Sequence, residues 1–183
     1  MRRIILQSNP VFHPVHISRC RYIVMKGSAG SGKSADTAQE YILRLLQERE
    51  RNLLCIRKAE ISNRYSTFAE LSAAIRRMGV FDLFIVRESP MSIQCKNGSQ
   101  ILFRGMRNSV EREKLKSITV AQGKLTDIWI EEATELTQQD FEILDDRLRG
   151  ELPAGLFYQI KLTFNPVSAS HWIKRVFFDR YDP

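Results

Sequence analysis

The sequence predicts an α/β fold with a mainly parallel central sheet, flanked by helices and extended by an antiparallel hairpin. Two observations indicate it: short apolar runs at residues 22–25 and 53–56 enclose a helical pattern, and two further strand-like runs flank Asn97-Gly98. The 183 residues, 43% of them hydrophobic, are enough for one full core and too few for two ordinary domains. We therefore expect a single domain over residues 1–183.

The first elements form a strand, a helix and a strand. Residues 22–25 predict a buried strand, apolar residues recur at helical spacing from Lys33 to about Glu50, and residues 53–56 predict the next strand. Because parallel strands need a crossover helix, this order indicates a βαβ unit.

The middle of the chain predicts a helix followed by a hairpin. The helical pattern covers residues 60–78. The Asn-Gly turn tolerates positive φ, so residues 92–95 and 100–103 are expected to pair antiparallel. Residues 104–124 form the most basic stretch and predict a polar, partly mobile segment.

The last third predicts a strand, a helix and a strand. Residues 125–130 form an apolar run typical of a buried strand. Thr137 and Asp140 have the spacing of a capping box, so they are expected to start a helix that Gly150 ends. Residues 158–164 predict the final strand, whose alternation of apolar and polar residues favours one less buried face.

Composition narrows the functional class. The 28 Lys and Arg exceed the 21 Asp and Glu, and the formal charge of +7 favours a polyanionic partner, with nucleic acid ahead of a merely basic surface. The three cysteines are scattered and no ligand-type residue lies near His13 and His16 in the sequence, so we expect neither a disulfide framework nor a metal site. No run of 18 apolar residues and no signal sequence occurs, so we expect neither a membrane span nor secretion by signal peptide.

A phosphate-binding motif lies between the first strand and the first helix. It reads Gly27-Ser28-Ala29-Gly30-Ser31-Gly32-Lys33-Ser34 and matches G-x-x-x-x-G-K-[ST] in full. Small residues let backbone N–H groups surround phosphate oxygens. Lys33 is expected to reach the β- and γ-phosphates and Ser34 to bind Mg²⁺. The motif therefore predicts a nucleotide site for ATP and Mg²⁺, against the alternative of a flexible Gly/Ser linker.

Polar residues follow two of the predicted strands at the edge where ligands of open α/β sheets bind. Glu131 is the candidate to hold Mg²⁺, and Glu132 the general base that orients and deprotonates the attacking water. The alternative is that both acids only complement the next helix N-terminus. Asn165 is expected to hydrogen-bond the γ-phosphate or the water, against the alternative of an ordinary Asn-Pro turn.

Together these segments resemble the N-terminal ATPase domain of the large subunit of tailed-phage terminases, which package DNA into proheads. The resemblance rests on Asn9-Pro10-Val11-Phe12, the glycine-rich motif, Cys55-Ile56-Arg57-Lys58, Ile128-Trp129-Ile130-Glu131-Glu132-Ala133-Thr134-Glu135-Leu136, Arg147-Leu148-Arg149-Gly150 and Thr163-Phe164-Asn165-Pro166. It covers about residues 9–180. Glu131 replaces the more usual Asp, as in a subset of that family.

The resemblance implies a P-loop NTPase of the ASCE type that hydrolyses ATP to translocate double-stranded DNA. It also implies a ring of identical subunits, a portal protein and a small terminase subunit as partners, and the cytoplasm of the infected bacterial host as location. Such proteins usually continue into a C-terminal nuclease domain. This chain stops after the ATPase motifs, so we expect no DNA cleavage from it. We expect a monomer in isolation, because the ring is normally templated by a portal.

Arginines commonly neutralise the transferring γ-phosphoryl group. Arg57 follows the second strand and is the candidate to reach its own nucleotide. Five others are candidates for a neighbouring subunit or DNA phosphates, with a solvated surface role as the alternative for each: Arg104, Arg107, Arg112, Arg147 and Arg149. DNA binding is expected to be weak, independent of sequence and weakened by salt.

Two other functions stay open at this point. One is another P-loop DNA motor, such as a helicase, and the other is a nucleotide-gated binding module with little turnover. Measured ATP turnover distinguishes the binding module, which should hydrolyse little ATP, from a terminase or another P-loop DNA motor.

Overall fold

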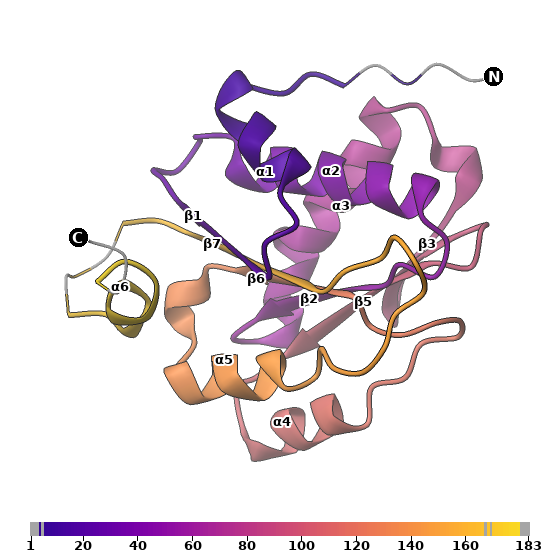
Figure 1. The fold of residues 1–183 in the computed structure, drawn as a ribbon. Helices are drawn as coiled ribbons and strands as arrows, with labels where there is room; N and C mark the ends of the chain where they lie inside the picture. Colours follow the sequence, from indigo (N-terminus) through magenta and orange to yellow (C-terminus); the bar gives the residue numbers. More distant parts are fainter. Residues whose placement is uncertain (1–3, 5, 167, 169, 180–183) are drawn as a thin grey trace.

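A seven-stranded sheet forms the centre of the computed structural model, which describes residues 4, 6–166, 168 and 170–179 (Figure 1). The strand order is β1-β7-β6-β2-β5-β4-β3. The strands are β1 (Tyr22–Lys26), β2 (Leu53–Arg57), β3 (Phe84–Glu88), β4 (Met91–Cys95), β5 (Gln100–Gly105), β6 (Asp127–Glu131) and β7 (Gln159–Phe164). From β1 to β5 all neighbours are parallel, and β4 and β3 add antiparallel pairs. This confirms the predicted mainly parallel sheet with an added hairpin.

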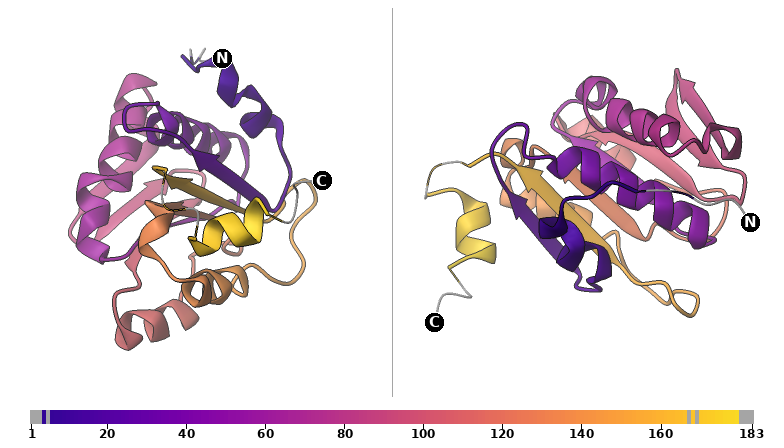
Figure 2. Two further views of the ribbon diagram at one scale, coloured as in Figure 1. Left: turned by 90° about the vertical axis from the view of Figure 1, so that its left-hand side faces the viewer. Right: turned by 90° about the horizontal axis from the view of Figure 1, so that it is seen from above.

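Helices cover both faces of the sheet (Figures 1 and 2). On one face α2 (Lys33–Gln47) packs beside α3 (Thr67–Arg77), with α1 (His13–Ile17) next to α2. On the other face lie α4 (Ser109–Lys116) and α5 (Gln138–Asp145), and α6 (Trp172–Phe177) contacts α5 through aromatic rings. Buried apolar residues form two clusters, one on each face of the sheet. The fold therefore has three layers, with a hydrophobic core on either side of the sheet.

The position of β7 decides where the site forms. β7, the last strand among the described residues, lies between β1, which precedes the glycine-rich motif, and β6, which precedes the two acids. A strand inserted between these two is the ASCE arrangement of P-loop NTPases. It brings the carboxyl ends of β1, β7 and β6 to one edge of the sheet.

Local signals explain most element boundaries. Thr137 Oγ1 accepts from the Asp140 amide at 3.1 Å and Asp140 Oδ2 accepts from the Thr137 amide at 3.1 Å, which confirms the capping box. The turn after β4 closes through Asn97 and Gly98, whose φ is 100°. The helix predicted to continue to Gly150 instead ends at Asp145, and the chain then turns with Leu148 still buried.

Some predicted elements were wrong in detail. The helix predicted over residues 60–78 is a 3₁₀ segment, Glu60–Tyr65, followed by α3. The basic stretch includes α4, and β3 was not predicted. The final strand was predicted to have one less buried face. This was wrong, because all six residues of β7 are buried. Two of its polar residues pair with charged side chains of α2: Gln159 accepts from Arg44, and Lys161 pairs with Glu40.

Candidate nucleotide-binding site

The glycine-rich loop connects β1 to α2 and its backbone is shaped for a close ligand. Gly30 and Gly32 have φ values of 75° and 85°, which residues with a Cβ rarely adopt. A Cβ on Gly27 would lie 3.1 Å from Ser31 Oγ, so a larger residue would crowd the loop. Because α2 begins at Lys33, its free N-terminal N–H groups face this loop and favour an anion there.

Lys33 is held across the loop. Its side chain is buried, and Nζ donates to the carbonyl oxygens of Gly27 at 2.7 Å and Ser28 at 3.1 Å and to Ser31 Oγ at 3.2 Å. All three acceptors are neutral, so a phosphate in the loop would offer the ammonium group stronger, charged acceptors.

Hydroxyl groups and a carboxylate meet where Mg²⁺ is expected. Ser34 Oγ donates to Glu131 Oε1 at 2.6 Å, and Thr163 Oγ1 donates to the other oxygen of the same carboxylate. Trp129 Nε1 donates to Thr163 Oγ1 at 2.8 Å and fixes its orientation. Hard oxygen donors of this kind suit Mg²⁺, which binds few protein ligands and keeps several waters. The donor set therefore fits the predicted ion.

Glu132 occupies an unusual backbone conformation directly after β6. Its φ of 52° and ψ of 52° lie in the left-handed region, which is strained for a residue with a side chain. Asn165 Nδ2, after β7, donates to Glu132 Oε1 in a long contact of 3.4 Å. The Glu132 carboxylate thus lies beside Asn165, at the carboxyl ends of β6 and β7.

One cavity of about 430 Å³ collects these groups. It is lined by residues 29–35 of the loop and α2, by Glu131 and Glu132, by Phe164 and Asn165, and by Glu70 of α3. Glu70 was not predicted, because no motif marks a single acid within a helix. Its carboxylate makes no hydrogen bond or ion pair with any described residue, so a third negative charge faces the cavity.

The arginines lie elsewhere. Arg57 forms a two-pronged ion pair with Glu135, with Nη2 to Oε1 at 3.0 Å and Nε to Oε2 at 3.2 Å, and it does not line the cavity. Arg112 Nε bonds Asp140 Oδ1 at 2.7 Å. Of the described residues that line the cavity, none is an arginine. The structure therefore does not bring Arg57 to the nucleotide site as the sequence predicted.

A cluster of buried charges lies behind the site, between α2 and the sheet. Lys161 of β7 is fully buried and pairs with Glu40, which also pairs with Arg44 at 2.7 Å. Arg51 Nη1 pairs with Asp127 at 2.6 Å. Burial lowers the pKa of Lys161 to about 8, although Glu40 opposes the change, and burial raises the pKa of Asp127.

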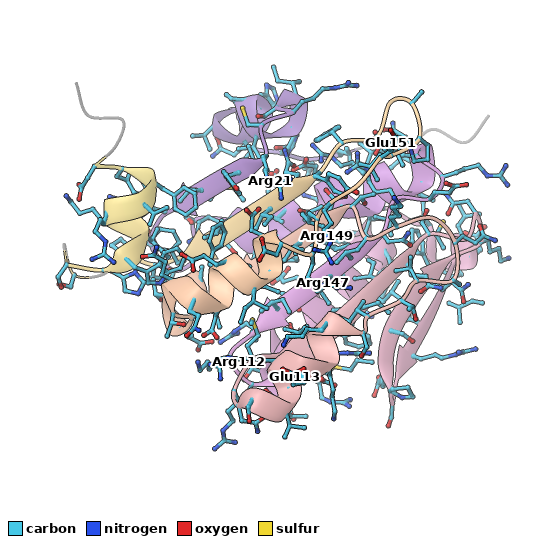
Figure 3. The ribbon with its side chains drawn as sticks, turned by 60° about the horizontal axis from the view of Figure 1, so that its bottom comes forward. Arg21, Arg112, Glu113, Arg147, Arg149 and Glu151 are labelled. Atoms are coloured by element: carbon cyan, nitrogen blue, oxygen red, sulfur yellow. The ribbon has the colours of Figure 1, made fainter. Side chains whose placement is uncertain are left out.

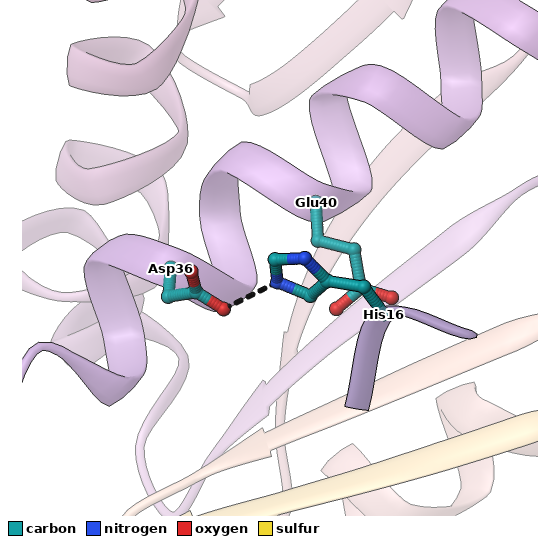
Figure 4. Close-up of side chains that lie close together, drawn as sticks. All are labelled: His16, Asp36 and Glu40. Carbon is teal, nitrogen blue, oxygen red and sulfur yellow. Dashed lines mark hydrogen bonds and ion pairs between the residues drawn. The ribbon is translucent and has the colours of Figure 1, made fainter. Parts of the chain in front are cut away.

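His16 meets a carboxylate that is distant in the sequence (Figure 4). Its Nε2 lies 2.6 Å from Asp36 Oδ2, and Ser8 Oγ donates to Asp36 Oδ1 at 2.6 Å. Glu40 lies close by, so the three side chains have metal-ligand spacing. However, Glu40 is already neutralised by Lys161 and an arginine, and a dication would meet both buried cations. We therefore interpret the cluster as the link between the N-terminal segment and α2.

Among the described helices, none combines the length and the apolar character that a membrane span requires.

Comparisons with known proteins agree with this architecture. The phage terminase large subunit family matches residues 19–183. The PBSX phage terminase large subunit of Bacillus subtilis strain 168 is 36% identical over 157 residues, which are 86% of this chain and 34% of that protein. The chain thus spans about a third of the length of this curated relative.

Solved structures show the same fold at low sequence identity. The large terminase from a thermophilic bacteriophage matches with a TM-score of 0.69 and 16% identity, covering 87% of this chain and 37% of that one. The complex of that terminase with ATP-gamma-S matches with a TM-score of 0.62 and 16% identity, covering 88% and 37%.

The ATPase domain of the Thermus phage P74-26 large terminase matches with a TM-score of 0.53 and 15% identity, covering 97% of this chain and 89% of that domain. The family match covers most of the chain, and the sheet order and the glycine-rich loop agree with it. The chain belongs to the phage terminase large subunit family.

Proposed function

We propose that this chain hydrolyses ATP with Mg²⁺ to drive double-stranded viral DNA into a prohead. The observation that carries the proposal is the single cavity in which Lys33 and Ser34 of the glycine-rich loop meet Glu131, Glu132 and Asn165. The large terminase from the thermophilic bacteriophage, which shares the fold, has been solved with ATP-gamma-S, and this supports nucleotide binding here.

Each residue has a role that follows from its place. The loop N–H groups and Lys33 hold the β- and γ-phosphates. Ser34 and Glu131 would hold Mg²⁺, which would neutralise charge on the phosphate oxygens. Glu132 accepts a proton from the water that attacks the γ-phosphorus, and the bond to the β-phosphate oxygen breaks to give ADP and phosphate.

Asn165 links the chemistry to the fold. Because it contacts Glu132 and follows the strand between β1 and β6, it is placed to orient the carboxylate and to respond when the γ-phosphate leaves. The charge needed from an arginine is proposed to come from a neighbouring subunit, since no described arginine lines the cavity.

The wider assembly follows from the family. We propose a ring of identical subunits on a portal protein, supplied with DNA through a small terminase subunit, in the cytoplasm of the infected bacterial host. In isolation the chain is expected to be monomeric, because the portal templates the ring.

Steady-state ATP turnover tests the assignment. Lys33→Ala is expected to weaken nucleotide binding, and Glu132→Gln to bind ATP normally with a kcat about 10²–10⁴ lower. Glu142→Gln, a change of the same kind on the exposed side of α5, serves as the control and should match wild type.

Two results would contradict the proposal. Wild-type turnover by Glu132→Gln would remove Glu132 as general base. Tight nucleotide binding by wild type with no turnover, even when the subunits are assembled on a portal with duplex DNA, would favour a nucleotide-gated switch over a motor.

A further inference from the structure

A second hollow lies at the edge of the sheet opposite the nucleotide cavity. The loop of residues 118–125, which leads into the start of β6, forms one wall, and the segment after α5 forms the other. Its volume is about 340 Å³, and the lining includes Lys124, Arg147 and Arg149. No carboxylate is among the described residues that line it. We call this feature the basic hollow.

The three cations of the basic hollow have only weak, neutral partners. Lys124 Nζ donates to the carbonyl oxygen of Glu151 at 3.0 Å, and Arg147 Nη2 donates to the carbonyl oxygen of Ile118 at 3.4 Å. Arg149 is exposed, and its side chain makes no hydrogen bond or ion pair within the described part of the chain. Arg147 and Arg149 both line the hollow and are labelled in Figure 3. None of the three cations therefore has an ion-pair partner among the described residues.

Arg147 also has an unused donor. Its Nε is buried and has no acceptor among the described residues. A buried N–H without an acceptor is unfavourable, and an anion in the hollow would supply one. The planar guanidinium fork matches the paired oxygens of a phosphate group, and binds them more specifically than a lysine does.

The hollow is shaped in advance. Leu148 is 2% exposed and anchors the backbone between the two arginines. Gly150 has a φ of 87°, and a Cβ there would lie 2.9 Å from Lys124 Nζ. Gly123 has a φ of 69°, and a Cβ there would lie 2.7 Å from Glu50 Cβ. Two tight glycine turns thus hold the cationic residues near one another, which reduces the entropy lost when an anion binds.

We propose that the basic hollow binds a backbone phosphate of duplex DNA. The identity of the polyanion rests on the proposed function. The triphosphate of the chain's own nucleotide is not the ligand, because the whole of β6 separates the hollow from Glu131 and the glycine-rich loop. Contacts to phosphate carry no sequence information, as a motor that moves any DNA requires.

Binding of a labelled random-sequence duplex, followed by fluorescence anisotropy without nucleotide over a range of salt, tests the proposal. Arg149→Glu is compared with Arg77→Glu, which reverses the charge of an exposed α3 arginine that has no partner among the described residues. Arg149→Glu should weaken binding much more than the control. Arg149→Ala should lower the slope of log affinity against log salt by about 0.9, because one phosphate fewer is neutralised.

A second variant guards against misfolding. Arg147→Lys keeps the charge but loses the fork, so it should weaken duplex binding while leaving the thermal unfolding midpoint near that of wild type. If Arg147→Lys unfolds early, Lys124→Gln takes its place in the same assay.

Three outcomes would overturn the proposal. They are equal loss of binding in Arg149→Glu and Arg77→Glu, an unchanged salt slope in Arg149→Ala, and no duplex binding by wild type. If Arg149→Glu lost binding of a fluorescent nucleotide but kept duplex binding, the hollow would be a nucleotide site, and the proposal would also be overturned. None of these outcomes bears on Glu132, so failure here is distinct from failure of the proposed ATPase.

Discussion

Replacing Lys161 with methionine tests the charges buried behind the nucleotide site. Lys161 is fully buried on β7 and pairs with Glu40. Its pKa is lowered from 10.5 to about 8 because burial disfavours the charged form. Between these two values the unfolded chain keeps a proton that the folded protein has released. The free energy of unfolding of wild type should therefore rise with pH across this window.

The magnitude follows from the change in pKa. A fall from 10.5 to about 8 corresponds to about 3 kcal/mol between the two protonation states. Lys161→Met has no proton to lose at this position. Relative to the variant, wild type should gain about 3 kcal/mol between about pH 7.5 and 10.5. Buried tyrosines and cysteines titrate in both proteins, so their contributions cancel in the difference.

Urea unfolding followed by tryptophan fluorescence at several pH values measures that difference. Lys174→Met, which removes an exposed lysine, should show almost no pH dependence relative to wild type. Glu40→Gln leaves Lys161 without its direct partner and should cost about 3–5 kcal/mol near neutral pH, and less at high pH. A pH-independent difference between wild type and Lys161→Met would refute the reasoning, because it would mean that Lys161 titrates normally.

Three further changes test the site. Thr163→Val removes the hydroxyl that orients the metal-side carboxylate, so half-maximal ATPase activity should need about tenfold more Mg²⁺; an unchanged Mg²⁺ titration would contradict this. Glu70→Gln removes a negative charge facing the triphosphate and should tighten binding of a fluorescent ATP analogue by about 1 kcal/mol, whereas weaker binding would give Glu70 a role in holding Mg²⁺. Arg57→Ala breaks the ion pair with Glu135 and should cost about 1 kcal/mol in thermal unfolding with ATP turnover retained; abolished turnover in a stable variant would restore Arg57 to the catalytic site.

The parts predicted best from the sequence are those with local causes. The glycine-rich loop, the Asn97-Gly98 turn and the Thr137 capping box each depend on residues within a few positions of one another, and each appears where predicted. The parallel sheet was also predictable, because strand and helix patterns alternate. β3 was missed although it begins with an apolar run, Phe84-Ile85-Val86. Ile85 and Val86 are exposed, so this run does not belong to a buried strand.

The parts not predicted depend on residues brought together by the fold. Alternation in residues 158–164 indicated a strand with one less buried face, yet Lys161 is buried because Glu40, 121 residues earlier, neutralises it. Glu70 and Asp36 reach their positions through helix packing, which leaves no pattern in the sequence. Arg57 was predicted at the correct strand end, but the sequence does not show that its guanidinium group pairs with Glu135 and not with the nucleotide.

The position of β7 has a consequence for how the protein is made. β1 lies at the edge of the sheet and pairs only with β7, so Tyr22 finds its partner Ile160 far later in the chain. During synthesis, β2, β5, β4 and β3 are neighbours and can assemble from residues 53–105, while the strand before the glycine-rich loop still lacks a partner. A ribosome that stops before residue 159 therefore releases a chain that carries the complete phosphate-binding motif and no site. The pairing of β7 means that the proposed nucleotide site forms only after β7 has emerged.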